Sequence, residues 1–130
     1  MITPSAEIEQ LIRRWYQRIE AGEMVSAATD LLSCDAAFRA IGTDKDEWFA
    51  HRAGLITAYG KAAEAGPPQI EVERIDAFSE GPVGWAVDEV LVARPGTQPI
   101  LMRHTFILRR EEGVWKVIHG HYSLPAPDGT

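Results

Sequence analysis

The segment from Met102 to Ser123, MRHTFILRREEGVWKVIHGHYS, constrains the fold of this chain more than any other segment. Two runs rich in β-branched and aromatic residues flank a Glu-Glu-Gly turn, a pattern that is typical of a β-hairpin. Three of the four histidines lie on these two runs. Because successive side chains of a strand point to opposite faces of a sheet, His119, His121 and Ser123 share one face. The hairpin therefore predicts a polar cluster on one face of a sheet.

The turn decides which residues of the first strand join this cluster. A three-residue turn with Gly113 in the left-handed conformation places Arg103 and Thr105 on the face of the histidines. A two-residue turn places His104 and Phe106 there instead, because a slip of one residue exchanges the two faces of a strand. Glycine at the third turn position favours the first register, so we expect Arg103 and Thr105 beside the histidines.

Apolar residues at helical spacing predict three helices before the hairpin. The first has Thr3 as its expected N-cap, and the second covers roughly residues 23–33. The third begins at the turn 42–48 and ends at Gly66, which two prolines follow. A short strand is expected between the second and third helices, at Cys34–Ile41.

From Gln69 onward the pattern changes to the two-residue period of strands. Four consecutive long strands are expected, one before the turn at Ser79–Pro82 and three at Val83–Ala93, Ile100–Arg110 and Val114–Tyr122. Their short connections predict an antiparallel meander. Three N-terminal helices packed against four long strands and one short strand make an α+β domain. Strands of this length predict a strongly twisted and curved sheet, and helices that close it leave a cavity on its concave side.

The composition limits the partners that this chain can have. A length of 130 residues fits one domain, and a net charge of −6 argues against a nucleic-acid partner, which needs clustered Lys and Arg. The N-terminus has no basic region followed by an apolar run, and no segment is long enough to cross a membrane. We therefore expect neither a signal peptide nor a membrane partner. The single cysteine, Cys34, is expected to be buried and unpaired, which suits a cytoplasmic location.

Two segments resemble known sequences. Residues 42–55, GTDKDEWFAHRAGL, resemble the GTDPxEW segment of SnoaL-like domains, and residues 103–127 resemble their C-terminal hairpin with its Arg-x-Thr, Trp and His-x-His-x-Ser. The chain is thus similar to the nuclear transport factor 2-like superfamily, and its ending is similar to the association domain of calcium/calmodulin-dependent protein kinase II. The resemblance implies one cone-shaped α+β domain over residues 1–125, followed by a flexible tail at 126–130.

The resemblance also implies an internal ligand pocket. The expected lining residues are Trp48, Tyr59 and Trp85 at the walls and Arg103, Thr105, His119 and His121 at a polar end. An arginine buried beside histidines needs an anion, which Asp88 or a ligand carboxylate would supply. The alternatives are hydrogen-bonded core histidines and an arginine ion pair on the outer face of the sheet.

Members of the superfamily that transfer protons at carbon use an Asp, a Tyr or an Asp–His pair inside the cone. By this resemblance Asp88, which lies on a central strand, or His121 is the candidate base. Arg103 or His119 would then stabilise an enolate oxygen. The superfamily also contains isomerases, cyclases, dehydratases and assembly modules, so the fold does not select among them.

A metal ion is a further alternative, because a His-x-His pair on a strand can bind one when a third ligand lies nearby. His104, Asp88 and Glu89 are the candidates for that ligand, but nothing in the spacing fixes their position. No metal and no cofactor are expected. Apolar side chains on both faces of the last strands predict a homodimer through the outer face of the sheet. Three hypotheses follow: a small-molecule-binding domain, a proton-transfer enzyme of isomerase, cyclase or dehydratase type, and an assembly module.

Overall fold

The computed structural model describes residues 1–127, so residues 128–130 of the tail expected at 126–130 lie outside the described residues. Its helices are α1 (Ala6–Glu20), α2 (Met24–Leu31) and α3 (Arg52–Ala63). Three strands are short, namely β1 (Thr3–Pro4), β2 (Arg39–Ile41) and β3 (Trp48–Phe49). Four strands are long, namely β4 (Gln69–Glu80), β5 (Val83–Ala93), β6 (Ile100–Glu111) and β7 (Val114–Ser123).

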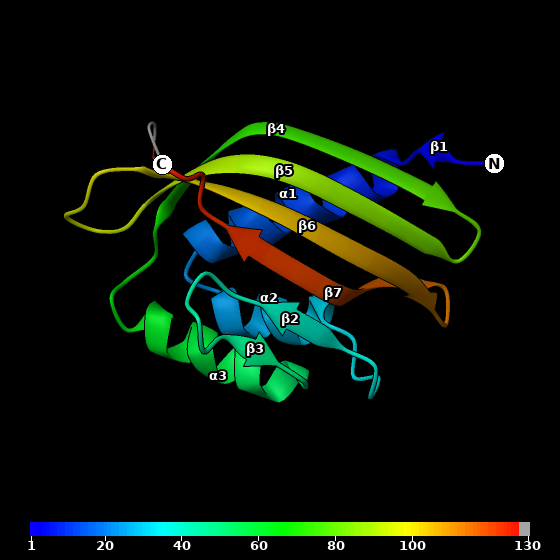
Figure 1. The fold of residues 1–130 in the computed structure, drawn as a ribbon, viewed down its shortest axis with the longest axis horizontal. Coiled ribbons are helices and arrows are strands. Elements are labelled where there is room, and N and C mark those ends of the chain that lie inside the picture. The colour runs from blue at the N-terminus through cyan, green and yellow to red at the C-terminus, as the bar shows by residue number, and fades with distance from the viewer. Residues whose placement is uncertain (128–130) are drawn as a thin grey trace.

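These strands form one curled sheet in the order β1-β4-β5-β6-β7-β2-β3. The long strands pair as the antiparallel meander that the sequence predicts, whereas β2 runs parallel to β7, so the sheet as a whole is mixed. Figure 1 shows the helices gathered on one side of the sheet, and α1 packs against β4 and β5. The predicted α+β class, with three helices against a curved sheet, is confirmed.

Helix α1 packs closely against the sheet because β5 has a glycine where the apolar side of the helix meets it. Ile8 and Ile12 are fully buried. A Cβ atom added at Gly84 of β5 would clash with the Ile8 side chain, so the glycine allows this close approach. The N-cap of α1 is Ser5, whose side chain accepts a hydrogen bond from the backbone N–H of Ile8 at 3.1 Å. Thr3 is therefore not the cap; it lies in β1, which pairs with the end of β4.

Contrary to the expectation from the sequence, the segment 42–49 does not lead directly into the third helix. It turns back so that Trp48 pairs with Ile41, and α3 begins only at Arg52. Trp48 is 67% exposed because it lies on this short edge strand, away from the core. Cys34 is also exposed, contrary to the expectation of a buried thiol, since it lies in the loop between α2 and β2.

The hairpin turn has two residues rather than the three that we expected. Glu112 and Gly113 both have positive φ angles, 53° and 81°, which is the type I′ geometry that fits the twist of paired strands. Glu111 accordingly faces Val114. A bulge at Ile118 then adds one residue to β7 and shifts the register of the rest of the hairpin.

Beyond the bulge, Thr105 faces His121, and Arg103 faces Ser123. The expected grouping of Arg103, Thr105 and the histidines on one face is therefore correct, although the turn that leads to it is different. Phe106 and Leu108 point to the opposite face and are buried in the core. The expected polar cluster therefore lies on the outer face of the sheet, away from the helices.

Candidate functional site

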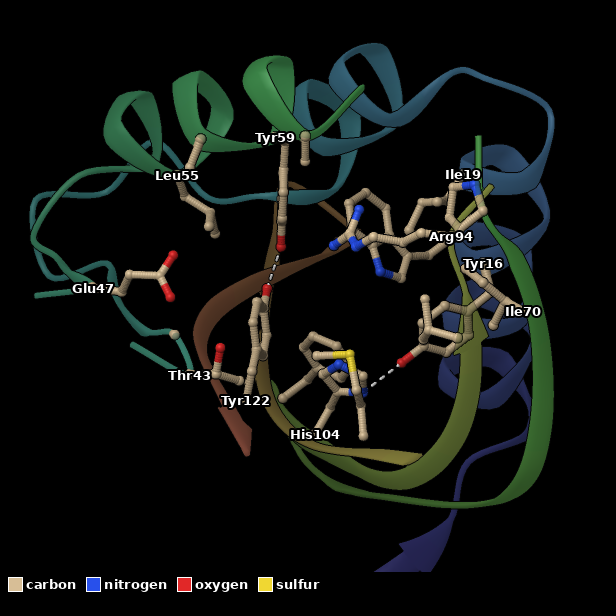
Figure 2. Close-up of a pocket in the computed structure, with 18 of the residues that line it drawn as sticks. Tyr16, Ile19, Thr43, Glu47, Leu55, Tyr59, Ile70, Arg94, His104 and Tyr122 are labelled. Atoms are coloured by element: carbon tan, nitrogen blue, oxygen red, sulfur yellow. Dashed lines mark hydrogen bonds between the residues drawn. The ribbon is translucent and has the colours of Figure 1, made fainter. Parts of the chain in front are cut away.

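A cavity of about 190 Å³ lies between α1, α3 and the concave face of the sheet, next to the β2–β3 loop. Its wall is mostly apolar and includes Trp15, Ile19, Leu55, Ala58, Ile70 and Phe106. Its polar residues include Tyr16, Glu47, Tyr59, Arg94, His104 and Tyr122. Figure 2 shows these side chains converging on one space from the helices, the loop and the strands.

A buried hydrogen-bond network forms one side of this cavity. Asp88 of β5 and His104 of β6 are opposite each other in the strand pairing, and Nδ1 of His104 lies 2.8 Å from Oδ1 of Asp88. The hydroxyl of Tyr16, which projects from α1, lies 2.5 Å from Oδ2 of Asp88 and 3.0 Å from Nδ1 of His104. The side chain of Asp88 has no exposed surface. Three elements that are distant in sequence thus meet at one carboxylate.

The network determines which atoms carry hydrogen. Burial, followed by the negative charge of Asp88, raises the pKa of Tyr16 well above its ordinary value, so its hydroxyl stays protonated and donates to Asp88. In the neutral imidazole one ring nitrogen carries the hydrogen, and the adjacent carboxylate oxygen of Asp88 favours Nδ1. Nε2 of His104 is then left with a free lone pair.

His104 lines the cavity, and no hydrogen bond joins its Nε2 to any residue in the described part of the chain. Within that part, Trp115 Nε1 is the one fully buried side-chain nitrogen or oxygen without a partner, so Nε2 has contact with solvent. The His104 ring also stacks on Phe106, with 5.6 Å between the ring centroids, which fixes its plane. The imidazole is therefore held rigidly with its unpaired nitrogen available.

Two further tyrosines meet across the cavity. The hydroxyl groups of Tyr59 from α3 and Tyr122 from β7 are hydrogen-bonded to each other, as Figure 2 shows. Burial raises the pKa of Tyr122 to about 12 and raises that of Tyr59 well above its ordinary value. Gly120 makes room for this arrangement, since a Cβ atom there would lie 3.2 Å from the Tyr122 ring. Both hydroxyls stay neutral; one donates to the other, and the second keeps its hydrogen free to donate to a ligand oxygen.

The residues predicted for the polar end of the pocket lie on the outer face of the sheet. Nε of Arg103 forms an ion pair at 2.7 Å with Glu89. Thr105 and His121 are exposed, and Nδ1 of His119 lies 2.9 Å from the backbone oxygen of Arg39. None of them lines the cavity. The structure thus keeps these residues together but places them on the side of the sheet opposite the cavity.

The predicted wall residues divide between the two faces. Tyr59 lines the cavity. Trp85 lies on the outer face, where its ring packs against Phe78 with 6.0 Å between centroids. Trp48 lies outside the cavity, and its neighbour Phe49 lines it instead. Asp88 does not line the cavity either, but it contacts it through Tyr16 and His104.

Sequence reasoning did not select Tyr16, His104 or Tyr122 for the pocket. A signal for Tyr16 is present, because it continues the helical spacing of Ile8 and Ile12 and so belongs to the buried stripe of α1. His104 and Tyr122 occupy the alternate positions of the same two strands, so selecting the other face of the hairpin would have found both.

Within the described residues, no group of three or more His, Cys, Asp or Glu side chains is arranged to hold a metal ion. No helix in residues 1–127 is long and apolar enough to span a membrane.

Comparison with known proteins identifies the family. The model of the SnoaL-like domain matches residues 8–127, and the chain therefore belongs to this family. A comparison with curated proteins finds no match.

Solved structures show the same fold at low sequence identity. An NTF2-like protein of unknown function from Pseudomonas putida KT2440 is 23% identical, with a TM-score of 0.83 over 95% of this chain and 88% of that chain. A protein from Xanthomonas campestris, provisionally named a calcium/calmodulin-dependent protein kinase II association domain, is 18% identical, with a TM-score of 0.78 over 94% and 87% of the two chains. A protein from Parabacteroides distasonis, provisionally named a ketosteroid isomerase, is 16% identical, with a TM-score of 0.75 over 92% and 86%. These similarities establish an NTF2-like fold.

The three tyrosines should remain protonated while the chain is folded. In the unfolded chain they titrate near pH 10, whereas their folded pKa values are raised, for Tyr122 to about 12. Above about pH 10 the unfolded state therefore binds fewer protons than the folded state, and the free energy of unfolding falls as the pH rises. Above pH 10 we expect the tyrosinate absorbance to rise at the same pH at which the circular dichroism of the folded chain is lost. Titration of the tyrosines near pH 10 in a chain that stays folded would contradict the buried network.

Proposed function

We propose that this chain binds one small, mostly apolar molecule in the cavity between the helices and the sheet. The observation that carries the proposal is a mostly apolar cavity on which a few polar side chains converge, which is the usual form of a ligand site. Its volume, about 190 Å³, is below the range of about 300–1,000 Å³ that drug-sized ligands occupy. The ligand should therefore be a small molecule, of the size of a single substituted ring.

Cyclohexanone is a suitable neutral probe for this cavity, because it combines an apolar ring with one carbonyl oxygen. Ligand-observed NMR should show that it binds the wild-type chain and that Ala58→Phe, which fills the cavity, removes the binding. Ala63→Phe, at an exposed position of the same helix, is the matched control and should bind as the wild type does. Equal binding by all three chains would show that the probe lies elsewhere.

The network of Asp88, Tyr16 and His104 favours a second function, proton transfer to or from the bound molecule. Nε2 of His104 would accept a proton from a carbon next to a carbonyl group, and Asp88 would stabilise the imidazolium that forms. The hydroxyl of the Tyr59–Tyr122 pair whose hydrogen is free can donate to the oxygen on which the enolate charge develops. Return of the proton to a different carbon would complete an isomerisation. The provisional name of the Parabacteroides distasonis protein describes a reaction of this kind.

In this proposal His104 is the base, and Asp88 is a positioning residue that holds its ring. His121, the other base suggested by the sequence, is exposed on the outer face and does not line the cavity. His104 can reach a molecule in the cavity without any movement of the sheet.

Exchange of the α-hydrogens of cyclohexanone and acetophenone in deuterated water tests this assignment. The wild type should accelerate the exchange, and His104→Gln should lower the rate by about 100-fold or more, the usual contribution of a general base. His121→Gln is the control and should exchange at the wild-type rate. Binding of cyclohexanone by the His104 variant would show that its cavity is intact. An exchange rate that is the same in the wild type and in His104→Gln would exclude His104 as the base.

We also propose that two copies associate through the outer face of the sheet. The helices cover only the other face, as Figure 1 shows, and Val87 and Ile107 of the outer face are 39% and 38% exposed. Trp85 lies directly opposite Ile107 on the same face, and Arg103 and Glu89 add an ion pair to this surface. A two-fold contact would cover these apolar groups and bring each charged pair near its copy.

Sedimentation equilibrium tests this dimer. Ile107→Glu should raise the dimer dissociation constant by about 30-fold or more, the effect of losing a contact of about 2 kcal/mol. Ile100→Glu, at an isoleucine that is 50% exposed outside this face, should leave the dissociation constant unchanged. A monomeric wild type would contradict the dimer, whereas a ring of more than two copies would favour the assembly function instead.

A cytoplasmic location is part of the proposal and is supported by the single cysteine; recovery of the chain from the culture medium would contradict it.

A further inference from the structure

Arg94 brings a positive charge to a cavity that is otherwise mostly apolar. It is the first residue after β5, at the start of the connection to β6, and its side chain lines the cavity. Figure 2 shows its guanidinium group turned toward the space that His104, Tyr59 and Tyr122 border. No other lysine or arginine is among the described residues that line this cavity.

The guanidinium group of Arg94 has no partner among the described residues. The other arginines, apart from Arg14, each bond to a carboxylate or a backbone oxygen. Glu47 lines the same cavity, but its carboxylate accepts the backbone N–H of Asp44 and forms no ion pair with Arg94. Arg94 therefore lacks a direct ion-pair partner within the described part of the chain.

The charge of Arg94 influences which ligand binds because a bound ligand removes water from its guanidinium group. Arg94 is exposed as a residue, so water can hydrate its guanidinium group while the cavity is open. A ligand that fills the cavity displaces part of this water, and a neutral ligand gives the guanidinium no charged partner in exchange. A carboxylate restores the lost hydrogen bonds with two parallel, charge-assisted ones. The cavity should therefore prefer an anion to a neutral molecule of the same shape.

We propose that Arg94 selects ligands that carry a carboxylate on a small apolar body. This inference rests on the proposed binding function and names the chemical class of the ligand. One guanidinium matches one planar, singly charged group, whereas a phosphate dianion would need further donors and would be repelled by Glu47 more strongly than a carboxylate is. The carboxylate would lie at Arg94, and the rest of the ligand would extend toward His104.

Cyclohexanecarboxylate and cyclohexanecarboxamide form a matched pair of probes, because they share shape and size and differ in charge. Calorimetric titration should show that the wild type binds the carboxylate about 10-fold more tightly than the amide, which is the effect of one hydrogen bond to a charged group. Arg94→Gln should remove this preference and leave the affinity for the amide within about twofold, since it keeps the polar side chain but not the charge. Arg94→Lys should retain part of the preference. Arg14→Gln, at another arginine without an ion pair and outside this cavity, should behave as the wild type does.

The outcomes separate this inference from the binding function. Equal affinity of the wild type for the two probes would overturn the role of Arg94 and leave the binding function intact. A carboxylate preference that persists in Arg94→Gln would also overturn it, because another group would then bind the anion. Failure of cyclohexanone and both ring probes to bind would overturn the binding function, and the role of Arg94 with it. Unchanged binding of the amide by Arg94→Gln shows that this variant is folded.

Discussion

The buried carboxylate of Asp88 is the constraint on which the arrangement of the cavity depends. A carboxylate without exposed surface is stable only when donors replace the water that it has lost. Here the donors come from two other elements, the Tyr16 hydroxyl on α1 and the His104 ring on β6. Removal of one partner from a buried charged pair costs about 3–5 kcal/mol, so the helix and the two strands are held in one relative position. The position of the candidate site follows from this requirement.

The same network gives the cavity a polar end without exposing a charge to it. Asp88 lies behind its two partners, which present a hydroxyl group and an imidazole to the ligand. The raised pKa values of the three tyrosines have burial as their first cause and keep neutral donors in an apolar wall. Arg94 is the one cation of the described lining, and it comes from a loop rather than from the core. The site thus combines a rigid side, formed by the sheet and α1, with a charged group at the end of β5.

The order of elements could be predicted from the sequence because it depends on local patterns. Helical spacing and two-residue alternation both persist over long segments, and they located the three helices and the four long strands. Alternation also correctly placed Arg103 and Thr105 on one face of β6 and His119 and His121 on one face of β7, but the two pairs share a face because of the bulge and not because of the predicted turn. It could not show which face the helices cover, since that depends on where α1 packs. The wrong choice of face moved the predicted site to the outer side of the sheet and left out His104, a neighbour of two selected residues.

Other features could not be predicted because they depend on contacts between segments that are distant in the sequence. The bulge at Ile118 has no sequence signal of the kind that Gly113 gives for the turn, yet it sets the register of half of the hairpin. Glu47 and Arg94 reach the cavity from loops, whose paths are set by packing rather than by a periodic pattern. Asp88 was selected as a carboxylate on a central strand, but only the structure shows that Tyr16 and His104 bind it.

The tautomer of His104 tests most directly the claim that Asp88 and Tyr16 hold its ring with Nε2 open to the cavity. Nitrogen-15 NMR of the histidine side chains distinguishes a protonated ring nitrogen from one with a free lone pair. In the neutral ring we predict that Nδ1 carries the hydrogen and that Nε2 is unprotonated, with a signal that shifts when cyclohexanone is added. A hydrogen on Nε2, or a signal that does not respond to the probe, would contradict the account.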